Sequence, residues 1–71
     1  MISERLERLI ADMDDKGVRF EDAVREFEKR YIMRVLDRCD GSLTRASNAL
    51  GIHRNTLTRK MAAYRIRRKL A

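Results

Sequence analysis

The sequence contains no proline and no tryptophan, and its 71 residues include only three glycines, one histidine and one cysteine. A single cysteine, Cys39, cannot form an intrachain disulfide, and it suits a reducing compartment. We expect it to be a small apolar group buried at the end of a helix. One cysteine and one histidine are too few for a zinc site, and there is no glycine-rich phosphate loop. We therefore expect no enzyme activity, no cofactor and no metal.

Long apolar runs are also missing. No stretch approaches the ~18 consecutive apolar residues that a membrane-spanning helix needs. The first residues include Glu4 and Glu7 and lack the apolar segment of a signal peptide. We therefore expect a cytoplasmic protein with neither a membrane partner nor a small-molecule substrate.

Acidic residues are absent from the second part of the chain. All eleven Asp and Glu lie in residues 1–40, beside nine Lys and Arg, which gives this part a net charge of −2. Residues 41–71 hold eight Lys and Arg and no acid, a net charge of +8. This distribution is typical of a surface that binds phosphates. A basic tail that only aids solubility is the alternative.

Strand patterns are absent too, which leaves the all-α class. A chain of this length forms one domain and buries only about 60% of its unfolded surface. Without disulfides, such a chain often completes its core with a partner. The composition by itself therefore favours an oligomer.

Residues 1–40 contain two amphipathic helices in the predicted fold. The first runs from Ser3, a possible N-cap, to about Asp14, and the second from about Phe20 to Cys39 after a break at residues 14–17. The apolar stripe of the first helix belongs either to the core or to a dimer interface, and we favour the interface. The second stripe is apolar at both edges, which predicts contact with the C-terminal part and with a second subunit. The expected interface residues are Leu6, Leu9, Ile10, Met13, Val24, Phe27 and Tyr31.

Residues 41–61 read GSLTRASNALGIHRNTLTRKM and predict a helix-turn-helix. Ser42 is a good N-cap for its first helix, and Gly51 can end that helix in a left-handed conformation. The second helix should run from Arg54 to Tyr64. The inward faces are expected to consist of Leu43, Ala46, Ala49 and Leu50 in the first helix and Leu57, Met61 and Tyr64 in the second.

The outward face of the second helix carries polar side chains and no acid. Two short helices joined by a turn occur in many proteins, so the motif alone does not indicate DNA binding. The types of side chain on its outward face must decide. Arg54, Asn55, Thr58 and Arg59 are of the types that hydrogen-bond base edges and phosphates in DNA. A merely solvated face usually mixes both signs of charge, so we favour a helix that enters the DNA major groove.

Residues 41–65 closely resemble the Fis family of bacterial nucleoid proteins and the Fis-type domain of many bacterial transcription activators. The matching residues are Gly41, Thr44, Arg45, Ala46, Leu50, Gly51, Ile52, Arg54, Thr56, Leu57 and Lys60. The likeness continues more weakly back to Phe20, through Glu26-Phe27-Glu28 and Tyr31-Ile32. It implies four helices per subunit, an intertwined homodimer and double-stranded DNA as the partner.

Under this resemblance the chain is a single domain, with dimerisation helices in 1–40, the helix-turn-helix in 41–64 and a basic tail in 65–71. The expected DNA contacts are Ser42, Thr44, Arg45, His53, Arg54, Asn55, Thr56, Thr58, Arg59 and Lys60. Four positions depart from the family pattern. Ser42 stands where Asn is frequent, His53 where Asn or Ser is frequent, Thr58 where Fis has Arg, and Arg65 where Fis has Gly. These departures leave the base preference open.

Three functions remain at this point. The first is a sequence-selective transcription regulator, and the second is an architectural, nucleoid-associated protein that bends DNA with little base preference. The third is a helical protein-interaction module, which the basic residues 41–71 disfavour. In the tail, Tyr64 and Ile66 are expected to pack on the core, while Arg65, Arg67, Arg68 and Lys69 either contact the DNA backbone or form a frayed end.

Overall fold

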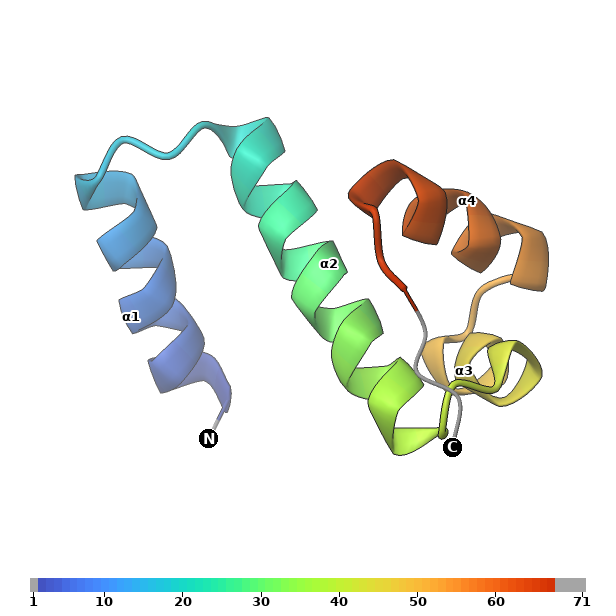
Figure 1. The fold of residues 1–71 in the computed structure, drawn as a ribbon. Helices are drawn as coiled ribbons and strands as arrows, with labels where there is room; N and C mark the ends of the chain where they lie inside the picture. The colour runs from blue at the N-terminus through green and yellow to red at the C-terminus, as the bar shows by residue number, and fades with distance from the viewer. Residues whose placement is uncertain (1, 68–71) are drawn as a thin grey trace.

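The structure is a computed structural model that describes residues 2–67, and Figure 1 shows its helices in space. They are α1 (Ile2–Asp15), α2 (Phe20–Arg38), α3 (Leu43–Leu50) and α4 (Arg54–Tyr64). No strand occurs in this part of the chain, and the predicted all-α class is confirmed. None of the described helices is long and apolar enough to cross a membrane.

The local sequence determines where α2 begins and ends. Glu21 and Asp22 place negative charge in its first turn, where the helix dipole favours it. After its last turn, Asp40 and Gly41 have positive φ angles of 53° and 80°. The N–H of Gly41 donates to the carbonyl of Leu36 at 2.9 Å. Left-handed residues at this place reverse the chain and satisfy the last helical carbonyls, so the predicted end of the second helix at about Cys39 is confirmed.

The turn between α3 and α4 also follows from local signals. The Oγ of Ser42 accepts the N–H of Arg45 at 3.2 Å, so Ser42 is the predicted N-cap of α3. Gly51 ends the helix with a φ of 70°, and a Cβ there would meet no described atom within 4 Å. The backbone conformation, and not crowding, therefore favours glycine at this position.

The core is built from residues between Ile32 and Ile66. Three helices contribute to it: α2, α3 and α4 pack together, and their buried side chains form one cluster. Its buried members are Ile32, Val35, Leu36, Cys39, Ala46, Leu57 and Met61. Leu43, Leu50, Ile52, Tyr64 and Ile66 pack partly buried around it. The predicted burial of Cys39 and the predicted packing of Tyr64 and Ile66 are confirmed.

α1 contributes nothing to this core. It lies on the opposite side of α2 from α3 and α4 (Figure 1), and its residues 3–15 are exposed except for the half-buried Met13. Val24, Phe27 and Tyr31 of α2 are exposed as well. The apolar stripe of α2 thus divides in two: its C-terminal part packs on α3 and α4, and its N-terminal part lies outside the core cluster and stays exposed.

Two details of the predicted helices are wrong. α1 begins at Ile2, so Ser3 lies inside its first turn and does not cap it. Ala49 is exposed, while Ser47 is buried in its place. The positions 43, 46, 47 and 50 lie on one helical face, and Ser47 is small enough to be buried there. Its hydroxyl donates to the carbonyl of Thr44 at 3.0 Å, so its burial leaves no polar group unsatisfied.

Candidate nucleic-acid interface

Most of the expected DNA contacts are exposed on α3, on α4 and at the turn between them. Thr44 and Arg45 lie in the first turn of α3, and the contiguous residues 53–56 lie at the start of α4. Thr58 and Arg59 follow in the next turn and are also exposed. Ser42 is half-buried and caps α3. These side chains therefore share one region of the surface, with Lys60 as the exception discussed below.

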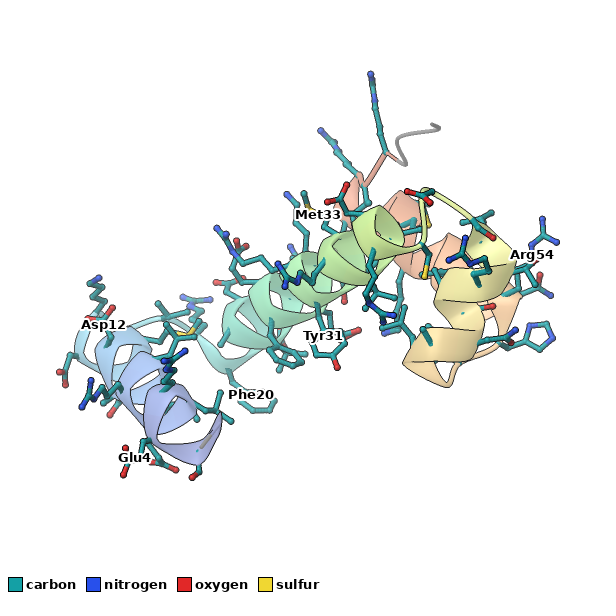
Figure 2. The ribbon with its side chains drawn as sticks, turned by 90° about the horizontal axis from the view of Figure 1, so that it is seen from below. Glu4, Asp12, Phe20, Tyr31, Met33 and Arg54 are labelled. Carbon is teal, nitrogen blue, oxygen red and sulfur yellow. The ribbon has the colours of Figure 1, made fainter. Side chains whose placement is uncertain are left out.

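The two ends of the molecule have net charges of opposite sign: α1 holds more acidic than basic residues, and the charged residues of α3 and α4 are all basic. Figure 2 shows Arg54 at the end formed by α3 and α4, far from Glu4 and Asp12 on α1. Residues 41–67 contain no acid, so no carboxylate of α3 or α4 competes with a phosphate for Arg45, Arg54 or Arg59. A surface of this kind attracts a polyanion through its summed field.

His53 determines the local geometry at the start of α4. It is the N-cap of α4, and its Nδ1 accepts the N–H of Asn55 at 3.0 Å. An imidazole nitrogen that accepts is unprotonated, so the proton of the neutral ring lies on Nε2. The exposed side chain can then donate a hydrogen bond from Nε2 beside the free N–H groups of the helix end. We expected His53 only as a DNA contact; its capping function was signalled by its position directly before the first helical residue.

The hydroxyl of Thr58 is already used as a donor. Its Oγ1 donates to the carbonyl of Arg54, one turn earlier, at 3.0 Å. In this rotamer Thr58 can offer a ligand only the lone pairs of its oxygen and its methyl group. On DNA those groups suit an amino group of a base or the methyl group of thymine.

Lys60 differs from the other expected contacts because its side chain is bound to another helix of the chain. Its side chain is 36% exposed, and its ammonium donates a hydrogen bond to the carboxylate of Glu28 on α2. This bond raises the pKa of Lys60 and lowers the pKa of Glu28. It joins α4 to α2 across 32 positions of the sequence. The resemblance to the Fis family had indicated a DNA contact at Lys60, and only the three-dimensional structure reveals its partner.

A second surface consists of exposed apolar side chains on α1, the following loop and α2. Figure 2 shows Phe20 and Tyr31 projecting from one side of α2 and Met33 from the other. Phe20 is 82% exposed, and the rings of Phe27 and Tyr31 lie 5.5 Å apart. The residues of this surface that were predicted for the dimer interface are Leu6, Leu9, Ile10, Val24, Phe27 and Tyr31. Val18 and Phe20 are also exposed there but were not among the predicted interface residues. The half-buried Met13 lies next to them in α1.

A groove of about 540 Å³ lies away from both surfaces, between α2 and the segment after α4. Lys29, Met33, Arg34, Asp37 and Ile66 are among the residues that line it. It contains none of the expected DNA contacts. Arg67 also lines it, whereas Arg68 and Lys69 lie outside the described residues.

The fold and the exposed basic face define this chain as a helix-turn-helix protein. The family model described as bacterial regulatory protein, Fis family, matches residues 23–64, and the chain belongs to that family. It is 34% identical over 65 residues to a protein from Xylella fastidiosa strain Temecula1, whose name describes it as a Fis-like DNA-binding protein. A protein of the same description from strain 9a5c is 32% identical over 65 residues. Each match covers 89% of this chain and 72% of the relative. No solved structure matches significantly.

Proposed function

We propose that this protein is a homodimer that binds double-stranded DNA with α3 and α4 and regulates transcription in the bacterial cytoplasm. The observation that carries the proposal is the exposed, acid-free surface of α3 and α4, with Arg54 at the start of the second helix. In helix-turn-helix proteins that position meets the base edges of the major groove. The Fis-like names of the two relatives agree with this function.

The side chains of the surface divide into two groups. Arg54, Asn55 and Thr58 face bases in the proposed complex, because they lie on the outward side of the first two turns of α4. Arg is the best bidentate partner for O6 and N7 of guanine, and no other side chain in this turn can make that contact. Thr44, Arg45, His53, Thr56 and Arg59 contact phosphates, which position the helix without reading sequence. Ser42 supports them by capping α3.

The second subunit is proposed to pack on the exposed apolar surface of α1 and α2. Two subunits related by a two-fold axis present two copies of α4, so the preferred site should be roughly palindromic. Two recognition helices set closer than one turn of straight DNA would also require the bound DNA to bend.

Selection from a random duplex library, run with the wild type and with Arg54→Ala, tests this proposal. We expect the wild type to recover a motif with guanine in each half-site, and the variant to lose that preference at a cost of about 1–3 kcal/mol per half-site. Weaker binding of Arg54→Ala with an unchanged motif would make Arg54 a phosphate contact. Recovery of no motif by the wild type would favour an architectural protein that binds DNA with little base preference.

A further inference from the structure

Two adjacent cations in the middle of α4 have different surroundings. Arg59 is exposed and forms no ion pair with any residue in 2–67. Lys60 is bound to Glu28, whose side chain is only 26% exposed. The helix therefore carries one cation that is available to a ligand and one that is neutralised by another helix of the same chain.

Lys60 lies on a side of α4 that also carries one of the proposed phosphate contacts. It follows Thr56 by four residues, so the two side chains lie one turn apart on the same side of α4. Thr56 is exposed and is one of the proposed phosphate contacts. The flexible four-carbon stem of a lysine would let a released ammonium reach the stretch of DNA backbone beside Thr56.

We propose that Glu28 is a positioning residue that withholds Lys60 from DNA phosphates and so limits binding that ignores base sequence. This inference rests on the proposed DNA-binding function. Phosphate contacts strengthen binding to every sequence alike, and each contributes to the salt dependence of the affinity. Keeping one cation per subunit off the DNA therefore makes the protein easier to release from sites without the preferred bases.

The internal ion pair has an advantage over a contact with DNA at ordinary ionic strength. A partly buried pair is screened by salt much less than an exposed one. A lysine–phosphate contact instead forms at an exposed surface, where it competes with the counterions that surround DNA. Moving Lys60 to DNA would also leave the half-buried carboxylate of Glu28 without its cationic partner.

Fluorescence anisotropy on a duplex of random sequence tests the inference, with salt varied between roughly 50 and 200 mM. The readout is the slope of log affinity against log salt, which a merely structural ion pair would not change. In Glu28→Gln we expect tighter binding and a slope steeper by about 1.8 for a dimer with two released lysines. Over this fourfold range of salt, binding should weaken about 12-fold more than in the wild type.

Three further variants complete the experiment. Lys60→Gln and the double variant Glu28→Gln/Lys60→Gln should both keep the wild-type slope. The matched control is Glu26→Gln, which changes the net charge equally but frees Arg30, the partner of Glu26 at 3.1 Å. Glu26 lies two residues from Glu28, on a different side of α2, so this control should also keep the wild-type slope.

The inference is overturned if Glu28→Gln folds and keeps the wild-type slope, or if Lys60→Gln flattens it. It is also overturned if Glu26→Gln steepens the slope as much as Glu28→Gln, because net charge alone would then be responsible. If Glu28→Gln fails to fold, the slope of Lys60→Gln tests the inference: an unchanged slope supports it, and a flatter slope overturns it. If the wild type shows no salt-dependent DNA binding, the proposed function itself is contradicted. If the wild type binds DNA with the expected salt dependence but the variants do not behave as stated, only the inference about Glu28 is contradicted.

Discussion

Arg65 ends α4 in a conformation that suits glycine better than arginine. Its φ and ψ angles are 56° and 41°, and its N–H donates to the carbonyl of Ala62 at 3.3 Å. A left-handed conformation brings the Cβ of an L-residue close to the following carbonyl oxygen, at a cost of roughly 1–2 kcal/mol. The resemblance had identified Arg65 as a departure from a glycine, and the backbone angles give that departure a physical consequence.

We expect Arg65→Gly to stabilise the protein by about 0.5–1 kcal/mol. The gain is smaller than the strain because glycine has more conformational freedom to lose on folding. Urea unfolding at neutral pH measures it. Arg65→Ala removes the same charge but keeps a Cβ, so that variant should give no comparable gain. An equal gain in both variants would attribute the effect to charge.

His53 offers a second test at this scale, because it caps α4 with a ring nitrogen. His53→Ala leaves the N–H of Asn55 without its acceptor and should cost about 1 kcal/mol of folding stability. His53→Asn keeps a side chain that can accept this bond and should cost little. If both variants unfold at the wild-type urea concentration, the cap contributes nothing to stability.

At the scale of the helices, the ion pair between Glu28 and Lys60 makes the packing of α4 on α2 depend on pH. The hydrogen bond from Lys60 lowers the pKa of Glu28. The contribution of Glu28 to folding stability is therefore present above its ordinary pKa, near 4.5, and is lost as the pH falls through the lowered pKa. The pKa of Lys60 is raised for the same reason, so its contribution is present below about 10.5 and is lost as the pH rises through the raised value.

We expect Glu28→Gln to be less stable than the wild type at neutral pH, by at most about 1 kcal/mol because the pair is partly exposed. The difference should disappear below the lowered pKa of Glu28, where the wild-type carboxyl is protonated as well. Urea unfolding of both proteins across the acid range measures this. A difference that persists unchanged at low pH would show that the glutamine disturbs packing and not the ion pair.

The helices were predictable from the sequence to the extent that their signals are local. Ser42 and Gly51 act within one turn of the backbone, and both ends of α3 were predicted correctly. The sequence predicted that Ala49 would be buried, whereas the buried residue is Ser47. This was missed because a serine can form a hydrogen bond within its own helix, and the polarity of the side chain does not reveal such a bond. The pairing of Lys60 with Glu28 was missed because its partners lie 32 residues apart. Such a contact depends on how α4 packs on α2, and no spacing along one helix encodes it.

At the scale of the whole molecule, the described chain leaves more large apolar side chains exposed than it buries. Its core contains seven hydrophobic residues, whereas nine large ones are exposed. Eight of these nine lie on α1, on the following loop and on α2 between Phe20 and Tyr31, whereas Met33 projects from the other side of α2 (Figure 2). An exposed apolar surface of this kind is typical of an interface. A second copy of the chain, with the same unpaired helices, would bury it, as the predicted dimer requires.

Phe27→Asp should therefore abolish the dimer, while Met33→Asp should leave it intact. Phe27 is 58% exposed, and burying such a ring in an interface contributes up to about 1.5–3 kcal/mol. A carboxylate there would instead lose its water without gaining a partner, which costs several kcal/mol. Met33 is a matched control because it is 48% exposed on the side of α2 opposite Phe20 and Tyr31 (Figure 2). Light scattering at micromolar concentration should give a dimer for the wild type and Met33→Asp, and a monomer or an unfolded chain for Phe27→Asp. A monomeric wild type, or equal loss of the dimer in both variants, would contradict this interface and leave α1 without its expected partner.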